Sequence, residues 1–273
     1  MAEAAPARLG DRPVDAVLLD YGFTLVTFSR PDASLRSAHE EIRRRLLAAG
    51  AGPVPSAEVL LRGVHDRVER AVERHESGGV LRELDVVSAE REAYADLGLR
   101  FPSPLLDEVA GIAQRAWWDG VLVGAGVPAT LAALRRGGLR LALCSNAPYR
   151  PSSMHAQLHH LGLASLLDGA TFSSEVGWRK PAAPIFAACA GALGVPAERC
   201  VMVGDRRRED VAGARSAGMA TVRTREHRDD PGEVDADVVI DRLSQLPRLL
   251  FGAATEGAGV VASGDIGSSR RTR

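Results

Sequence analysis

The sequence predicts an α/β fold with a mainly parallel sheet, and a small helical domain inserted after the first strand. Two observations predict this class. Beyond about residue 121, helical stretches alternate with short runs of Val, Ile and Leu, the pattern of strands covered by helices on both faces. Between the first strand-like run and that point, apolar residues recur at helical spacing instead.

The first predicted strand ends at an acidic residue. Residues 14–19 read Val-Asp-Ala-Val-Leu-Leu, and Asp20-Tyr21-Gly22 follows them. A short apolar run before a glycine-containing turn is typical of a buried strand. The carboxyl ends of strands border the ligand crevice of open α/β sheets, so Asp20 is expected at that crevice. A buried carboxylate costs desolvation free energy unless a cation or a reaction uses it, although an aspartate that caps a turn looks similar.

Four helices are expected in the segment after this strand. Residues 27–31 are interpreted as a linker, and Asp32 begins the first helix. Its apolar face consists of Leu35, Ala38, Ile42 and Leu46. Ser56 opens a second helix, Ser88 caps a third, and a fourth covers residues 103–119. These helices predict a small domain of their own.

The remainder of the chain alternates between the two kinds of element. The expected helices cover residues 128–136, 151–161, 181–193 and 207–217. The expected strands cover residues 139–144, 169–173, 199–203, 220–223 and 237–240. The two ends, residues 1–13 and 252–273, lack the apolar content to order themselves, and we expect both to be disordered.

Composition narrows the class of protein. The chain has 273 residues and a formal net charge of −1, so no overall basic footprint for nucleic acid is present. Its three cysteines show no metal-like spacing and are interpreted as buried thiols in a reducing compartment. Residues 1–13 lack the apolar stretch of a secretory signal, and no run is long enough to span a bilayer. We therefore expect a cytoplasmic protein without a membrane or nucleic-acid partner.

Three further motifs place polar side chains beside predicted strand ends. Ser145-Asn146 follows the strand at 139–144, and Lys180-Pro181 precedes a helix. Gly204-Asp205 follows the strand at 199–203, and Asp210 comes five residues later. Because parallel strands end at one edge of a sheet, these side chains are expected near Asp20.

Together these motifs resemble the haloacid dehalogenase-like (HAD) superfamily. The resemblance rests on Asp20 with Thr24 and Leu25, on Ser145-Asn146, on Lys180-Pro181, and on Gly204-Asp205 with Asp210. It implies a Rossmann-like core over residues 14–29 and 121–250, and a helical cap of the C1 type over residues 30–120. It also implies a hydrolase, most often a phosphatase that acts on a small phosphorylated metabolite. The sequence does not indicate an oligomeric state.

The resemblance assigns a nucleophile and a metal site. Asp20 would attack phosphorus and form an aspartyl-phosphate, which divides one difficult step into two. The implied ligands of Mg²⁺ are Asp20, the backbone carbonyl of Gly22, Asp205 and Asp210. Asp210 also fits a simpler interpretation, an acid that complements the dipole at the beginning of a helix.

The remaining family motifs would act on the phosphoryl group. The residues implied to bind it are Ser145, Asn146 and Thr24. Lys180 would supply a positive charge to the nucleophile and the phosphoryl group. The alternatives are a turn-forming Ser-Asn pair and a solvated surface lysine.

Gly22 departs from the phosphatase pattern, which has a second aspartate two residues after the nucleophile. That aspartate protonates the leaving oxygen and later deprotonates water, work typically worth roughly 10²- to 10⁴-fold in rate. Acyl and aryl phosphates should tolerate its loss best. The cap residues able to replace it are His39, His65, Glu69, His75 and Glu76. Arg206-Arg207-Arg208 is a second departure, either an anchor for an anionic substrate or a solvated partner of Glu209 and Asp210.

Two other functions remain open. Dehalogenation of a short haloacid needs no leaving-group acid, which fits Gly22, but the carboxylates of Asp205 and Asp210 favour a cation in the site. A degenerate site kept only for binding would also lack that acid. It leaves the presence of Asp20, Lys180 and Asp205 unexplained. Magnesium dependence separates phosphatase from dehalogenase.

Overall fold

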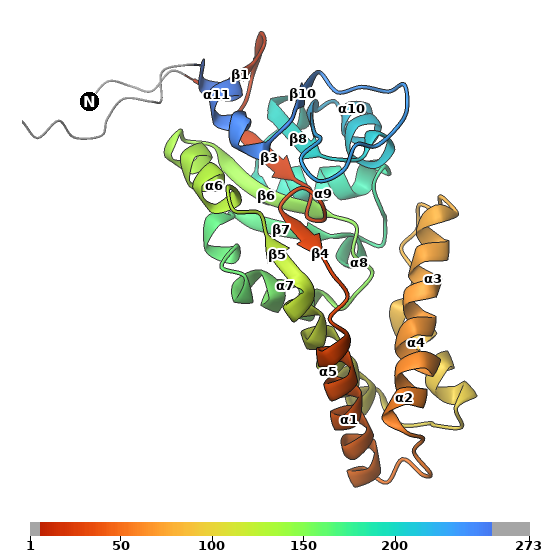
Figure 1. Cartoon of the computed structure of the whole chain (residues 1–273). Helices are drawn as coiled ribbons and strands as arrows, with labels where there is room; N and C mark the ends of the chain where they lie inside the picture. The colour runs from red at the N-terminus through yellow and green to blue at the C-terminus, as the bar shows by residue number, and fades with distance from the viewer. Residues whose placement is uncertain (1–5, 253–273) are drawn as a thin grey trace, which may run out of the picture.

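The structure is a computed structural model, and it describes residues 6–252. A six-stranded parallel sheet forms the core, with strand order β10-β9-β8-β3-β6-β7 (Figure 1). The strands are β3 (Ala16–Leu19), β6 (Arg140–Ser145), β7 (Gly169–Phe172), β8 (Cys200–Gly204), β9 (Ala220–Thr224) and β10 (Val238–Ile240). The predicted α/β class with a mainly parallel sheet is therefore confirmed.

Strand β3 lies at the centre of this sheet, with β6 on one side and β8 on the other. Leu19, its last residue, is in register with Leu143 of β6 and Val203 of β8. The segments that follow these three strands consequently leave the same edge of the sheet. This register is what brings residues about 125 and 185 positions from Asp20 to its side.

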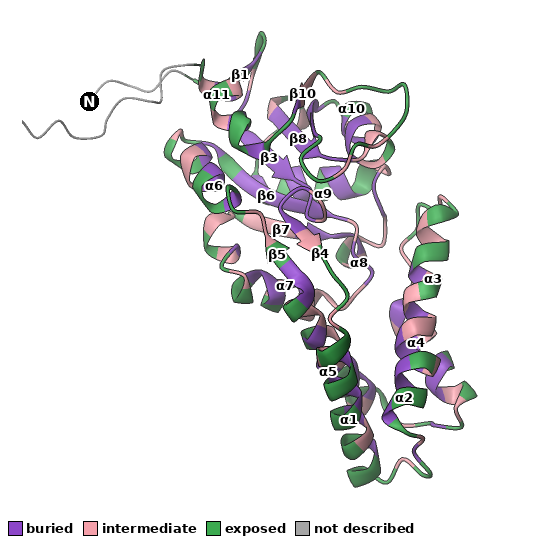
Figure 2. Cartoon of the chain, in the orientation of Figure 1, coloured by how far each residue is buried: buried purple, intermediate pink, exposed green. Residues whose placement is uncertain are grey.

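Helices cover both faces of the sheet. Side chains of β3 alternate between two apolar clusters, with Val17 and Leu19 on one face and Ala16 and Leu18 on the other. The first face packs against α6 (Val127–Arg136), α7 (Pro151–His160) and α11 (Leu246–Phe251). The second face packs against α9 (Ala183–Leu193) and α10 (Gly213–Ser216). Burial on both faces explains why the strands are continuously apolar (Figure 2).

Residues after β3 form a helical cap with a core of its own. Its helices are α1 (Asp32–Ala48), α2 (Ala57–Leu60), α3 (Asp66–Ser77), α4 (Val86–Asp96) and α5 (Ser103–Ala116). A π-helical turn (Leu61–His65) joins α2 to α3, and a 3₁₀ turn (Trp117–Gly120) ends α5. The expected apolar face of α1, including Leu35, Ile42 and Leu46, is fully buried against the other cap helices.

Two expected helix starts have different outcomes. The hydroxyl of Ser56 accepts a hydrogen bond from the backbone N–H of Val59, so Ser56 caps α2 as predicted. The prediction that Ser88 caps the third helix is wrong. Asp85 is the cap, and its carboxylate accepts hydrogen bonds from the backbone and the hydroxyl of Ser88. Two residues able to cap a helix lie three positions apart here, and the carboxylate is the stronger acceptor.

A two-stranded ribbon joins the cap to the core. β4 (Val26–Phe28) pairs antiparallel with β5 (Val121–Val123), at the points where the chain enters and leaves the cap. The expectation of a simple linker at 27–31 is therefore wrong for its first two residues. Each strand has three residues, and each partner lies about 95 residues away, so no local pattern reveals the pairing.

The start of the chain also differs from expectation. Residues 1–13 were expected to be disordered, but β1 (Arg8–Leu9) and β2 (Arg12–Pro13) form a hairpin whose Leu9 is buried in the core. The fold is completed by the short helix α8 (Ser173–Val176) and by helical turns at Ala164–Leu166, Ala197–Arg199, Arg207–Ala212 and Leu243–Gln245. Residues 1–5 and 253–273, which include nearly all of the expected C-terminal disorder, lie outside the described part.

The cysteines are buried thiols, as the sequence predicts. Cys144, Cys189 and Cys200 are free thiols, and all three are buried. Among the described residues, no helix combines the length and apolar character needed to cross a membrane.

Two buried histidines in the cap predict acid sensitivity. The rings of His39 and His65 meet edge to face at 5.7 Å, and the indole N–H of Trp117 donates to Nε2 of His65 at 3.3 Å. Burial lowers the pKa of His65 to about 4, assisted by His39. In the unfolded chain His65 binds a proton near pH 6.5, whereas in the folded cap it stays neutral until about pH 4. The free energy of unfolding therefore falls as the pH drops from 6.5 towards 4.

We expect a loss of about 2 kcal/mol from this group between pH 7 and pH 5. Urea unfolding of the wild type and His65→Gln at both pH values measures it, because the glutamine does not titrate. The variant should lose less stability than the wild type on acidification. Equal losses would show that His65 is not the acid-sensitive group.

Candidate active site

The carboxyl edge of the sheet carries the predicted site residues. Asp20 follows β3, Ser145 ends β6, and Asp205 follows β8. Lys180 precedes α9, and Asp210 lies in the π-helical turn Arg207–Ala212. One carboxylate oxygen each from Asp20, Asp205 and Asp210 lies within 4.8 Å of the others.

Lys180 holds two of these carboxylates. Its Nζ donates to Asp20 Oδ1 at 2.5 Å and to Asp210 Oδ1 at 2.6 Å, and the lysine is only 4% exposed. Burial alone would lower the pKa of Lys180, but the two carboxylates outweigh it and raise that pKa. Burial raises the pKa of Asp210 to about 6, a rise that Lys180 limits. The lysine is therefore a permanent cation that compensates the buried acids.

Asp205 accepts no such hydrogen bond from the described residues. It is 1% exposed, and within residues 6–252 neither of its carboxylate oxygens has a hydrogen-bond partner. Burial, together with repulsion from the carboxylates of Asp20 and Asp210, raises the pKa of Asp205 to about 7. A buried carboxylate with open lone pairs, beside two other carboxylates, fits the all-oxygen donor set that Mg²⁺ prefers. The residues therefore fit the expected metal.

Arg228 supplies the only ion pair that the described chain offers to Asp205. Its Nη1 lies 3.1 Å from Oδ2, in an orientation that does not make a hydrogen bond. The guanidinium also stacks over the ring of Phe23, 4.1 Å from its centroid. Phe23 has φ 58°, a conformation that residues other than glycine rarely adopt. No sequence pattern points to Arg228, because it lies in a loop without a motif.

Asn146 lines the adjoining cavity, but both atoms of its side-chain amide bind the chain. Its Oδ1 accepts from the backbone N–H of Lys180 at 2.7 Å, and its Nδ2 donates to the carbonyl of Lys180 at 3.1 Å. The predicted substrate-binding residue thus holds the lysine backbone in place. Of the other two, Ser145 lines the adjoining cavity, whereas Thr24 is buried and its hydroxyl has no partner among the described residues.

A neighbouring aromatic ring fills the space that a side chain at position 22 would need. A Cβ atom there would lie 2.8 Å from Cε2 of Phe28. The Phe28 ring also packs edge to face against Tyr21 and Phe23. Aromatic packing therefore takes the space in which the phosphatase aspartate would begin.

A cavity of about 340 Å³ opens beside these residues, between core and cap. Its core side includes Asp20, Ser145, Lys180, Arg206, Glu209 and Arg228. Its cap side includes Glu69, Val72, Glu73, Glu76, Trp117 and Trp118. Of the three consecutive arginines, only Arg206 lines the cavity. Arg207 instead binds the backbone and side chain of Asp230, and Arg208 lies 3.8 Å from Glu209, one of the two partners that the simpler interpretation expects.

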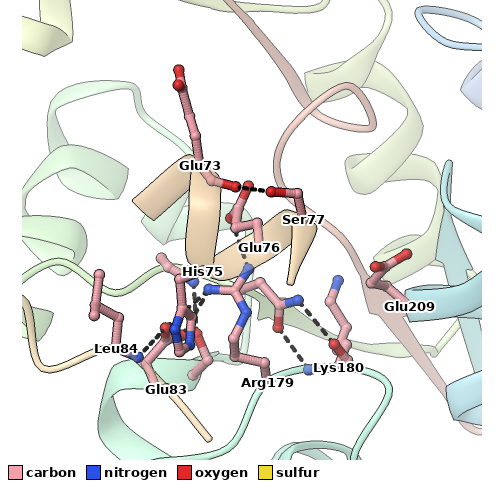
Figure 3. A network of polar contacts seen from close by, with 12 residues as sticks. Glu73, His75, Glu76, Ser77, Glu83, Leu84, Arg179, Lys180 and Glu209 are labelled. Carbon is pink, nitrogen blue, oxygen red and sulfur yellow. Dashed lines mark hydrogen bonds and ion pairs between the residues drawn. The ribbon is translucent and has the colours of Figure 1, made fainter. Parts of the chain in front are cut away.

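Ion pairs and hydrogen bonds hold the cap against the core. Arg179, next to Lys180, binds Glu76 at 2.7 Å and Glu83 at 2.9 Å, both from the cap (Figure 3). Arg150 binds the cap residue Glu90 at 2.7 Å. The sequence could not reveal these pairs, because charged residues are common in the cap helices and each partner lies 60 or more positions away.

Residues 14–218 match the model of a hydrolase family, the haloacid dehalogenase-like hydrolases. The chain belongs to this family. It is 32% identical to a plasmid-encoded phosphoglycolate phosphatase of Cupriavidus necator, over 87% of this chain and 94% of that protein. It is 28% identical to a glyceraldehyde 3-phosphate phosphatase of Methanopyrus kandleri, over 85% and 95% of the two chains. Membership confirms the resemblance and makes this HAD protein a hydrolase.

The fold is also that of solved family members. The 2-haloacid dehalogenase of Pseudomonas syringae pv. Tomato DC3000 superposes with a TM-score of 0.61 over 86% of this HAD hydrolase and 97% of that chain. Their sequence identity is 22%, so this likeness concerns the architecture alone.

Proposed function

We propose that this HAD hydrolase is a Mg²⁺-dependent phosphatase that acts on a small phosphorylated metabolite through an aspartyl-phosphate. The observation that carries the proposal is the buried carboxylate group of Asp20, Asp205 and Asp210, in which Asp205 has open lone pairs. Lys180 and Arg228 balance two of the three carboxylates, and a divalent cation would neutralise the negative charge that remains. The two phosphatases similar along nearly the whole chain support the same chemistry.

The residues present divide the work of phosphoryl transfer. Asp20 is the nucleophile, and Lys180 orients its carboxylate through the 2.5 Å hydrogen bond. Asp205, Asp210 and the Gly22 carbonyl would join Asp20 as metal ligands. When bound, Mg²⁺ would supply charge neutralisation between the carboxylate and the phosphoryl oxygens.

Other residues complete the phosphoryl site. Ser145 would donate to a phosphoryl oxygen from the wall of the cavity, and Asn146 keeps Lys180 in position. Thr24 contributes a buried hydroxyl beside the nucleophile loop.

We infer a cytoplasmic enzyme with a small-molecule substrate, without a nucleic-acid or membrane partner.

Gly22 favours one second candidate, dehalogenation of a 2-haloacid. Halide leaves without a proton, so this reaction does not need the missing aspartate. The carboxylates of Asp205 and Asp210 oppose it, because a carboxylate-bearing haloacid would meet further negative charge. We therefore place it second.

A direct comparison of substrates tests the proposal. Purified enzyme is given acetyl phosphate, 4-nitrophenyl phosphate or 2-chloropropionate, each with Mg²⁺ and with EDTA. We expect release of phosphate or 4-nitrophenol only with Mg²⁺, and no chloride release. Metal-independent chloride release, or no turnover of either phosphate, would contradict the proposal.

A further inference from the structure

The site lacks an acid for the leaving group, and four carboxylates in the cavity wall are candidates: Glu69, Glu73, Glu76 and Glu209. Three of these carboxylates have features that disfavour a role as the proton donor. Glu76 forms an ion pair with Arg179 at 2.7 Å, and Glu209 lies 3.8 Å from Arg208, so each already has a cation as its neighbour. Glu73 is exposed to solvent.

Glu69 differs from the other three. It lies on α3, a cap helix that lines the cavity, and both of its carboxylate oxygens lie 3.0 Å from the hydroxyl of Tyr149. No ion pair reaches it from any residue between 6 and 252. Burial raises the pKa of Glu69 to about 7. The hydrogen bond from Tyr149 and the charge of Arg30 oppose this rise in pKa. The charges of Glu73 and Glu76 add to it.

Tyr149 fixes this carboxyl against the catalytic loop. It lies three residues after Asn146, whose amide holds the backbone of Lys180. The tyrosine therefore ties Glu69 of the cap to the segment that also carries Ser145. Its own ring lines the same cavity as Asp20 and Glu69.

We propose that Glu69 is the proton donor to the leaving oxygen, in place of the aspartate that Gly22 lacks. The inference rests on the proposed phosphatase function. It makes Glu69 a catalytic residue contributed by the cap, and Tyr149 a positioning residue.

The proton balance of both half-reactions then closes. In the first, Asp20 Oδ forms a bond to phosphorus, the ester P–O bond breaks, and the carboxyl proton of Glu69 passes to the departing alkoxide. In the second, water attacks phosphorus and the bond from phosphorus to Asp20 breaks. The Glu69 carboxylate takes the proton of that water, and Asp20 recovers its electron pair.

Leaving-group dependence tests this assignment. Glu69→Gln keeps the shape and an acceptor for Tyr149 but carries no transferable proton. We expect roughly a 10²- to 10⁴-fold loss of kcat/KM with ethyl phosphate, whose alkoxide needs the proton. With 4-nitrophenyl phosphate, whose phenolate leaves unaided, the loss should stay under about tenfold. Glu92→Gln, an exposed carboxylate on the cap helix α4 that does not line the cavity, is the control and should change neither substrate greatly.

The pH dependence gives a second readout. Above about pH 7 the wild type should lose kcat with ethyl phosphate as Glu69 deprotonates, and Glu69→Gln should lack this fall. Adding Gly22→Asp with Phe28→Ala to Glu69→Gln should restore part of the rate, because the second change clears the ring that lies 2.8 Å from the new Cβ position.

Equal losses on the two substrates, or an unchanged pH limb in Glu69→Gln, would overturn the role of Glu69 while leaving the phosphatase intact. A wild type without any turnover of 4-nitrophenyl phosphate would instead overturn the proposed function, and the proton donor with it. Glu69→Asp checks the fold, since it keeps the acid and should retain more ethyl phosphate activity than Glu69→Gln.

Discussion

Asp20→Asn should abolish turnover of acetyl phosphate and 4-nitrophenyl phosphate, with a fall in kcat of about 10⁴-fold or more. The amide cannot form the phosphoryl bond, and no other described carboxylate has the position after β3. Lys180 keeps its second partner, Asp210, at 2.6 Å, so the fold should survive. Removing one negative charge should also make binding of inorganic phosphate equal to or tighter than in the wild type.

Steady-state assays and phosphate titration by calorimetry measure these two effects. Asp15→Asn is the matched control, because Asp15 immediately precedes β3 at the opposite edge of the sheet and pairs with Arg199 at the surface. It should leave kcat unchanged. Comparable activity in Asp20→Asn and wild type would exclude a covalent role for Asp20.

Lys180→Met should cause the largest loss of stability, about 3–5 kcal/mol at pH 7 without metal. Asp20 and Asp210 would then remain buried with no cation between them. The methionine keeps most of the side-chain volume, so the loss is electrostatic. Turnover should also fall sharply, because the nucleophile loses the group that orients it.

The pH dependence of this loss has a definite sign. Without Lys180 the pKa of Asp210, already raised to about 6 by burial, should rise further above its unfolded value of 3.8. A folded carboxyl with a raised pKa is least stable when charged, so the deficit should be large at pH 7 and shrink towards pH 4. Urea unfolding with EDTA at several pH values measures it.

A second substitution separates charge from packing. Lys180→Met combined with Asp210→Asn should recover part of the lost free energy, because one uncompensated charge is gone. If the double variant is less stable by the sum of the two single effects, Lys180 and Asp210 do not stabilise each other in the folded protein.

The sheet and the motif positions were predictable because each depends on a short local pattern. The apolar run before Asp20 and the runs before Ser145 and Asp205 each identify a strand and its end. The sheet register then brings these ends together without further information. The same locality explains why Ser56 was correctly placed as a helix cap.

Features that depend on distant partners were not predictable. The contact of Arg228 with Asp205 and Phe23 comes from a loop without a motif. The β4–β5 ribbon pairs two three-residue strands across the entire cap. Glu69 was one of five acid or base candidates in the cap, and its place in the cavity wall and its hydrogen bond with Tyr149, both of which depend on distant residues, distinguish it from the others.

The contacts of Arg179 limit how far the cap can be exchanged as a module. Arg179 adjoins Lys180 in the chain, yet its guanidinium is held by Glu76 and Glu83 from the cap (Figure 3). A chimera that carries the cap of a relative without these two carboxylates would leave a cation, 4% exposed, unpaired beside the nucleophile loop. Swapping specificity between relatives therefore requires transplanting the pair of glutamates together with the cavity wall.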